Sequence, residues 1–417
     1  DPNTPVVWGG VHPTIFPHQT VENPYVDYVI SDEGEISLLE LAQFLEGKIE
    51  SPKKVKSLTY KENGKIFTNP KAEYIDLRES SPPKWELLDD LKKYVNHVLV
   101  GDEIVKSFPI HTGRGCVFRC AFCIHNTILR RGWRPISAEH IINEVQVVME
   151  KTGANFIAFY DEHFFIDINR TMKLCDLVKE NGMDFRWDTT CRSDILANGY
   201  MSIEKNIRKV ADSGLKMLLI GMESGTQRML DLMKKDTTVE QNLRAVEVCR
   251  DYDVVPNCTF MFGLPTETLG EIYQTVNFAK KLHDIFPKVM ISGMFIFRPY
   301  PGGELYEMAK GMGFKEPTKL EDWSDIDKIL GYTDLSNLPW IEEKNREIVN
   351  NIEYYVQLSV RTPKSLKYKI LRNMAEWRVK NKRFKFPVER KLVRVYKSLV
   401  STRKAETMPE TELEVAC

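Results

Sequence analysis

Residues 116–123 read Cys116-Val117-Phe118-Arg119-Cys120-Ala121-Phe122-Cys123, which places three cysteines in the spacing CxxxCxxC. A structural zinc site and an electron-transfer iron–sulfur site each need a fourth ligand. The other five cysteines of the chain are scattered and form no CxxC pair. Three thiolates on a 4Fe–4S cluster instead leave one iron open to a substrate. We therefore predict that Cys116, Cys120 and Cys123 hold such a cluster, with a zinc knuckle or three unrelated buried thiols as the alternatives.

The cysteine loop lies in a region, from about residue 106 to 314, where strand patterns alternate with helix patterns. Helices are indicated at 138–151, 168–180 and 238–251. Strands are indicated at 105–111, 156–160, 185–190, 217–220, 257–262 and 289–297. Six successive βα units predict an α/β fold whose parallel sheet is curled into a partial (β/α)6 TIM-like barrel.

The three-cysteine loop and the alternating strands and helices together resemble the radical S-adenosylmethionine superfamily over roughly residues 105–315. The resemblance implies that the acidic end of the second strand binds the methionine amino group of S-adenosylmethionine. It further implies that the end of the third strand faces the methionine carboxylate, the end of the fourth contacts the ribose, and residues 259–267 lie on the adenine side. The implied contacts are Phe122, Tyr160, Asp161, Glu162, Thr190, Arg192, Glu223, Ser224 and Gly225. No catalytic residue is assigned.

The charges at the strand ends agree with this resemblance. A ligand that carries an ammonium, a carboxylate and ribose hydroxyls needs acidic, basic and hydrogen-bonding groups that converge from several strands. Asp161, Glu162, Arg192 and Glu223 supply such groups. His163 is expected to be a pocket or core histidine rather than an iron ligand.

The amino-terminal residues resemble the last third of the cobalamin-binding domain that precedes many radical enzymes. The resemblance rests on Gly9-Gly10-Val11-His12-Pro13-Thr14 and on residues 26–35, and it implies cobalamin contacts by Gly9, Gly10, His12, Glu33 and Gly34. Asp1 starts within a pattern, so we expect the chain to be a fragment. We expect cobalamin to be a cofactor of the full-length protein and to form no stable complex with residues 1–417.

These patterns divide the chain into five predicted segments. They are the end of a Rossmann-like cobalamin-binding domain (1–47), a linker with a hairpin (48–104), the barrel (105–315), a helical C-terminal extension (316–404) and a disordered tail (405–417). The extension is locally basic and interleaved with aromatic residues. The sequence leaves three interpretations of this extension open: a solvated helical face, a surface that docks on the barrel, or a peripheral membrane contact.

The leading functional hypothesis is a cobalamin-dependent radical enzyme that methylates an unactivated carbon of a small molecule or lipid. The resemblance implies that a 4Fe–4S cluster cleaves S-adenosylmethionine to a 5′-deoxyadenosyl radical, with flavodoxin or ferredoxin as reductant. A cyclase that resembles the anaerobic magnesium-porphyrin ester cyclases is the nearest alternative. A tRNA methylthiotransferase is disfavoured because no cysteine precedes Cys116, and a non-catalytic iron–sulfur module leaves the polar strand ends unexplained.

The composition of the chain bears on its partners and on its cellular compartment. The 417 residues carry 58 basic and 59 acidic side chains, and this balance argues against a nucleic-acid partner. Sparse cysteines are typical of a reducing compartment, so we expect a cytoplasmic protein.

Overall fold

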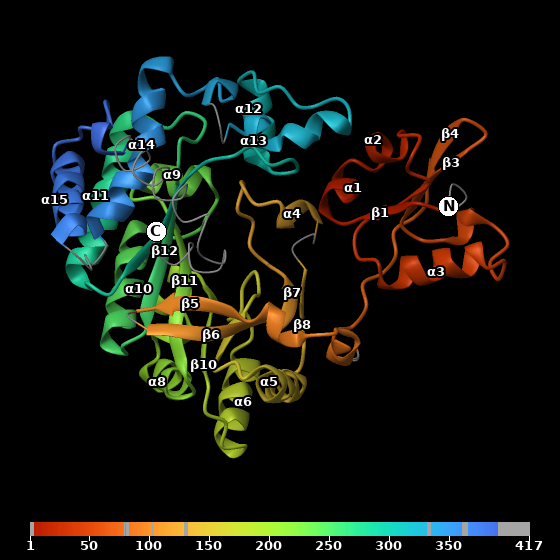
Figure 1. Cartoon of the computed structure of the whole chain (residues 1–417), viewed down its shortest axis with the longest axis horizontal. Helices are drawn as coiled ribbons and strands as arrows, with labels where there is room; N and C mark the ends of the chain where they lie inside the picture. The colour runs from red at the N-terminus through yellow and green to blue at the C-terminus, as the bar shows by residue number, and fades with distance from the viewer. Residues whose placement is uncertain are drawn as a thin grey trace, which may run out of the picture. The chain divides into compact units, whose positions relative to one another are not determined.

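A computed structural model describes residues 4–78, 80, 83–101, 103–128, 132–331, 335–360 and 366–390. The chain divides into two compact units, residues 1–342 and 343–417. The first unit contains a seven-stranded sheet, of which Figure 1 labels β5, β6, β10, β11 and β12. Its strand order is β13-β12-β11-β10-β9-β6-β5. Its strands are β5 (Asn96–Val100), β6 (Glu103–Ile110), β9 (Phe156–Phe159), β10 (Arg186–Cys191), β11 (Leu215–Glu223), β12 (Val255–Phe262) and β13 (Met290–Ile296).

All neighbouring pairs from β6 to β13 in this sheet are parallel, which confirms the six predicted strands and the partial barrel. Strand β5 adds an antiparallel edge next to β6. It lies in the segment that we predicted as a linker. The structure therefore differs from that division, because residues 96–100 satisfy their backbone hydrogen bonds on the barrel sheet.

Helices connect the parallel strands. In β10, Trp187, Thr189 and Cys191 are buried, whereas Asp188 and Thr190 between them are partly exposed. This period-two pattern gives the strand one buried face and one more open face. The helices of the first unit's barrel region are α4 (His125–Ile128), α5 (Ala138–Thr152), α6 (Ile168–Glu180), α7 (Ser193–Ala197), α8 (Glu204–Asp212), α9 (Gln227–Leu232), α10 (Val239–Asp251), α11 (Leu269–Ile285) and α12 (Glu304–Gly311).

Side-chain caps begin the long helices where the sequence indicated. Ser137 accepts a hydrogen bond from the backbone of His140 at the start of α5. Thr238 and Gln241 form a capping box at the start of α10. Such caps satisfy backbone N–H groups that have no partner within the helix. The predicted helices at 138–151, 168–180 and 238–251 are confirmed within one residue at each end.

A smaller four-stranded sheet forms the amino-terminal part in the order β1-β2-β3-β4. Strands β1 (Val7–Gly9) and β2 (Tyr28–Ile30) are parallel, as in a Rossmann-like unit. The predicted hairpin is β3 (Leu58–Glu62) and β4 (Lys65–Thr68), and β3 pairs with β2. The hairpin thus belongs to this sheet and not to a linker, because its apolar side chains pack on the same core. The helices here are α1 (Val11–Ile15), α2 (Pro17–Val21) and α3 (Glu35–Leu45).

The remaining elements are short or helical. A two-stranded ribbon, β7 (Gly113–Gly115) with β8 (Trp133–Pro135), follows β6. The first unit also contains α13 (Ile326–Ile329) and the 3₁₀ turns Pro52–Lys54, Trp85–Leu87, Leu91–Tyr94, Tyr200–Ser202, Glu321–Asp325 and Leu335–Asn337.

The second unit contains α14 (Glu343–Val360) and α15 (Leu366–Lys380), which pack against each other. The predicted division placed the C-terminal extension from residue 316, whereas the compact units divide after residue 342. Residues 391–404 of the predicted extension and the predicted tail at 405–417 lie outside the described residues. In the part of the chain that the structure describes, no helix combines the length and the apolar character needed to span a membrane.

Candidate functional site

The three predicted cluster cysteines lie on the loop that follows β7. Neighbouring segments hold this loop through the backbone of Ala121, whose N–H donates to the Met233 carbonyl at 2.8 Å and whose carbonyl accepts from the Leu305 N–H at 3.0 Å. A Cβ atom on Gly303 would lie 2.7 Å from the Ala121 oxygen, so the glycine permits this close approach. The loop is therefore anchored from two sides within the first unit.

The three loop thiols differ in exposure, and burial raises the pKa of two of them. Cys120 is buried, and Cys116 and Cys123 are partly exposed. Burial raises the pKa of Cys116 and raises that of Cys123 to about 11, and the nearby Cys120 adds to both increases. Among the described residues, no three histidine, cysteine, aspartate or glutamate side chains converge on one ion. Cysteines that bind different irons of one cluster need not converge in that way.

Arg192 lies against the cysteine loop. One guanidinium nitrogen is 3.9 Å from the Cys120 sulfur, and the group stacks 3.7 Å from the ring of Phe118. The other terminal nitrogen donates to the Lys235 carbonyl at 2.5 Å, and Nε donates to Asp194 at 3.0 Å. The side chain that we predicted at the methionine carboxylate thus also places a positive charge beside Cys120, a predicted cluster ligand.

Glu223 forms a buried ion pair with a lysine that the sequence analysis missed. Lys235 Nζ donates to Glu223 at 2.7 Å, and their side chains are only 8% and 10% exposed. A Cβ atom on Gly221 would lie 2.3 Å from this carboxylate, which explains the glycine. Burial acts to lower the pKa of Lys235, but Glu223 and Cys120 outweigh it and the pKa is raised. Lys235 therefore stays charged beside the loop.

The two acidic residues after β9 have different surroundings. Asp161 accepts hydrogen bonds from the backbone and hydroxyl of Thr112 at 2.6 and 2.5 Å, and Arg170 lies 3.8 Å away. Its carboxylate is therefore occupied in joining the ends of β6 and β9. Glu162 instead accepts from the Gly115 N–H at 3.1 Å, next to the cysteine loop. Glu162 is thus better placed than Asp161 to meet an ammonium group.

His163 is buried behind the cysteine loop. Its ring stacks on Phe118 with centroids 5.2 Å apart, and its Nδ1 accepts from the Phe165 N–H at 3.2 Å. Burial lowers the pKa of His163 to about 3, and Arg192 and Lys235 act in the same direction. The histidine is therefore neutral at physiological pH and serves packing.

The other predicted S-adenosylmethionine contacts divide into packed and open positions. Ser224 and the Gly225 N–H both bond to the hydroxyl of Thr275 on α11, at 3.1 Å each. Thr190 donates to the Asp161 carbonyl at 2.7 Å. Three predicted contacts, Asp161, Ser224 and Gly225, therefore bond to neighbouring parts of the protein. Phe122 packs beside Met229 and Leu264. Tyr160 is 67% exposed.

A further buried carboxyl lies in the predicted adenine-side segment. Glu267 accepts from the N–H groups of Gly263 and Leu264 at 2.5 and 3.1 Å. Burial raises the pKa of Glu267 to about 8 despite these bonds. The Gly263 carbonyl accepts from the Trp340 indole at 2.8 Å, so this turn is tightly held.

The two predicted cobalamin-contacting turns lie side by side. The Thr14 hydroxyl donates to the Gly10 carbonyl at 2.7 Å and accepts from the Asp32 N–H at 2.8 Å. Gly10 has a φ of 99°, which favours glycine, and its Cβ position is open. The ring of His12 packs instead on Trp323 of the 3₁₀ turn Glu321–Asp325, with the ring centroids 5.5 Å apart.

Glu33 connects the amino-terminal sheet to the ribbon that leads into the cysteine loop. Its carboxylate accepts from Arg114 at 2.9 Å and from Arg134, while Arg114 also donates to Glu35 at 2.6 Å. Arg114 lies two residues before Cys116. Glu33, which we predicted to contact cobalamin, thus has its carboxylate occupied by two arginines.

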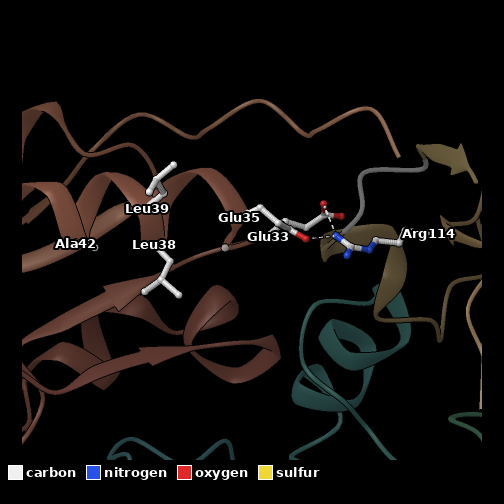
Figure 2. Close-up of a pocket in the computed structure, with 7 residues that line it drawn as sticks. Glu33, Glu35, Leu38, Leu39, Ala42 and Arg114 are labelled. Carbon is white, nitrogen blue, oxygen red and sulfur yellow. Dashed lines mark hydrogen bonds and ion pairs between the residues drawn. The ribbon is translucent and has the colours of Figure 1, made fainter. Parts of the chain in front are cut away.

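A pocket of about 650 Å³ opens beside this connection (Figure 2). Figure 2 shows the α3 side chains along one part of it and the ion pairs of Arg114 at the other. Gly9, Gly10 and His12 do not line it. The lining residues are Glu33, Gly34, Glu35, Leu38, Leu39, Ala42 and Arg114.

The parallel half-barrel, the three-cysteine loop and the charged strand ends define a radical S-adenosylmethionine domain. Residues 110–279 match the model of the Radical SAM superfamily, and this domain belongs to that superfamily. The superfamily match implies a 4Fe–4S cluster and S-adenosylmethionine as the cofactors of this domain, and it supports a radical S-adenosylmethionine enzyme.

Curated relatives match beyond this domain. The chain is 29% identical over 330 residues to an uncharacterized methyltransferase of Pyrococcus horikoshii, covering 79% of this chain and 68% of the relative. It is 26% identical over 312 residues to the anaerobic magnesium-protoporphyrin IX monomethyl ester cyclase of Rubrivivax gelatinosus, covering 74% of this chain and 53% of that enzyme. The chain thus spans only part of the length of these relatives.

A solved structure shares the fold. The cobalamin-dependent S-adenosylmethionine radical enzyme OxsB, with aqua-cobalamin and S-adenosylmethionine bound, superimposes with a TM-score of 0.63 at 19% identity. The match covers 90% of this chain and 58% of OxsB. At this identity the likeness supports the fold and leaves the substrate open.

Proposed function

We propose that the protein is a cobalamin-dependent radical enzyme that methylates an unactivated carbon of a small molecule or lipid. The observation that carries this proposal is a group of charged side chains around the cysteine loop. Four segments of the chain supply them: Arg192, Lys235, Glu223 and Glu162. These charges match a ligand that carries an ammonium, a carboxylate and hydroxyls. The relation to a methyltransferase supports the reaction type.

Each residue of this group has a distinct role in the proposal. When bound, the cluster and S-adenosylmethionine supply one-electron bond cleavage that side chains cannot perform. Glu162 accepts hydrogen bonds from the ligand ammonium, and Arg192 offers its guanidinium edge to the carboxylate. Glu223, held in place by Lys235, accepts from ribose hydroxyls. The protein thereby orients the ligand and excludes water from it.

Cobalamin is proposed to bind over the carboxyl ends of β1 and β2. Support comes from the two turns joined by Thr14, from the open glycine at Gly10, and from Gly34 in the adjoining pocket. Because the Glu33 carboxylate is held by arginines, we assign it to positioning rather than to cofactor contact. Visible spectra after desalting test this proposal, because a protein that binds cobalamin stably retains the cofactor's absorption bands.

The second candidate is a radical cyclase, favoured by the relation to the magnesium-porphyrin ester cyclase. The two reactions differ in the product. Mass analysis of the full-length, anaerobically reconstituted enzyme with candidate lipids and natural-product precursors would show the gain of a methyl group for a methyltransferase. A product with a new ring and no added carbon would overturn the methyltransferase proposal in favour of the cyclase.

The proposal includes a one-electron donor of the flavodoxin or ferredoxin type and a cytoplasmic setting. The seven cysteines in the described part of the chain are all free, which is typical of a reducing compartment. When dithionite replaces the protein reductant, cleavage of S-adenosylmethionine should be preserved.

A further inference from the structure

Helix α15 carries an apolar stripe on its open side. Leu366, Ile370, Met374 and Trp377 are 75%, 55%, 41% and 58% exposed. They are spaced four, four and three residues apart, which places them on one face of the helix. The opposite face carries Ala375 and Val379, which are buried. The helix is therefore apolar on two faces, and only one of them is used by the packing of the second unit.

Basic side chains flank this stripe. Residues 366–390 contain nine lysines and arginines against two glutamates. Both glutamates are already paired, Glu376 with Arg372 at 2.8 Å and Glu389 with Arg378. The exposed lysines therefore add to a positive field that the segment's own acids do not neutralise. Among the described side chains, those on and after α15 include Lys369, Lys380 and Lys385.

The chain after α15 extends the same surface. Arg378 donates to the carbonyls of Arg383, Lys385 and Phe386, which holds the following turn against the helix end. Phe386 and Val388 on this turn are 76% and 59% exposed. An ordered turn that displays large apolar side chains beside lysines extends the pattern of the helix.

We propose that α15 and the turn after it form a docking surface for an anionic phospholipid membrane, with the apolar stripe inserted among the acyl chains and the lysines on the headgroups. The combination of exposed apolar and basic groups fits a helix that lies in the membrane interface. A nucleic acid would use the positive charge but would leave Leu366, Ile370 and Met374 without a favourable partner. The inference does not depend on the reaction proposed above.

Co-sedimentation of the full chain with vesicles tests this. Vesicles of phosphatidylcholine and phosphatidylglycerol in equal amounts should sediment the protein, and vesicles of phosphatidylcholine alone should bind it about tenfold or more weakly. High salt should weaken binding because it screens the lysines. Equal binding to both vesicles, or to neither, would overturn the proposal.

Paired variants separate the two contributions. Ile370→Ser with Trp377→Ser removes half of the stripe, and Lys369→Gln with Lys380→Gln removes flanking charge. We expect each pair to weaken binding by about tenfold or more. The controls are Leu87→Ser, at a 78% exposed leucine in the first unit, and Lys92→Gln with Lys93→Gln, and they should bind as the unchanged protein does.

The remaining outcomes also decide the matter. All substituted side chains are exposed, so thermal unfolding should be unchanged and a binding loss cannot be ascribed to misfolding. Unchanged binding by the stripe variant would show simple electrostatic adsorption and overturn insertion. A loss of self-association in the stripe variant, measured by sedimentation velocity, would assign the stripe to a second copy. Displacement from vesicles by tRNA would assign the lysines to nucleic acid.

Discussion

The Lys235 ammonium donates to the Glu223 carboxylate at 2.7 Å, with both side chains at least nine-tenths buried. The Lys235 backbone also accepts a hydrogen bond from Arg192, which contacts Cys120. Two cations and one anion are thus linked next to the loop that holds the three cysteines. Because charges interact more strongly where water is excluded, this arrangement should influence both the cluster and its ligand.

The charge of Lys235 should raise the reduction potential of the cluster, which gains one electron and hence negative charge on reduction. Lys235→Met should lower the midpoint potential in an anaerobic redox titration without S-adenosylmethionine, and Glu223→Gln should raise it. Lys234→Met is the matched control, because this neighbouring lysine is exposed and pairs with Glu304. Shifts of the same sign in the two test variants would indicate a structural disturbance instead.

The three loop cysteines should be individually required for the cluster. Anaerobically reconstituted protein should hold about four irons, and alanine at Cys116, Cys120 or Cys123 should abolish reductive cleavage of S-adenosylmethionine. Cys175→Ala and Cys249→Ala change buried thiols in other parts of the fold and should retain iron and cleavage. Full cleavage by the triple alanine variant of the loop would refute the cluster assignment.

Arg192 should matter for ligand affinity more than for iron content. A charge-assisted hydrogen bond lost at a buried site costs about 1.5–3 kcal/mol, or roughly tenfold to a hundredfold in affinity. Calorimetry of Arg192→Ala should show this weakening for S-adenosylmethionine with iron unchanged. Arg186→Ala, at the start of β10 in an ion pair with Glu103 on β6, should bind normally. Wild-type affinity in Arg192→Ala would mean that the carboxylate binds elsewhere.

Removal of the Glu33 carboxylate should loosen the amino-terminal sheet from the cysteine loop. Glu33→Gln leaves Arg114 and Arg134 with weaker partners, which should cost about 1–3 kcal/mol of stability. Hydrogen exchange should rise in residues 113–116 and 133–135. Glu46→Gln, in the exposed pair with Lys48, should change neither quantity. Unchanged exchange in Glu33→Gln would show that other contacts hold the ribbon.

Glu267 should make the protein less stable as pH rises. Its folded pKa of about 8 lies above the ordinary value near 4.5, so the unfolded chain binds fewer protons between these values. The contribution of Glu267 to the free energy of unfolding is fully present below pH 4.5. It falls by up to about 1.4 kcal/mol per pH unit towards pH 8. Thermal unfolding of Glu267→Gln should lack this decline.

Glu271 provides a comparison of opposite sign. Hydrogen bonding to Arg228 lowers its pKa to about 2, so its contribution is present above the ordinary value and is lost as pH falls towards 2. Glu271→Gln should therefore lose stability at neutral pH and approach the unchanged protein in acid. The same pH response in both variants would contradict the assignment of either shift.

The amino-acid sequence by itself determined the barrel, its strand order and the loop that carries Cys116, Cys120 and Cys123. These features depend on local information, because periodic burial defines each strand and helix and the parallel βα connection has one favoured hand. The caps at Ser137 and Thr238 are local in the same sense, because each side chain bonds to the backbone three residues later. The family resemblance implied which strand ends contact the ligand.

Only the tertiary structure decided how the charged residues are used. Asp161 and Glu162 are adjacent in sequence, yet one is held by Thr112 and the other faces the loop. Lys234 and Lys235 look alike in sequence, but only Lys235 lies buried against Glu223. Glu33 likewise binds arginines about 80 and 100 residues away. The partner of each charged side chain depends on which segments the fold brings together and on which of them exclude water. The local periodicity of the sequence determines neither property.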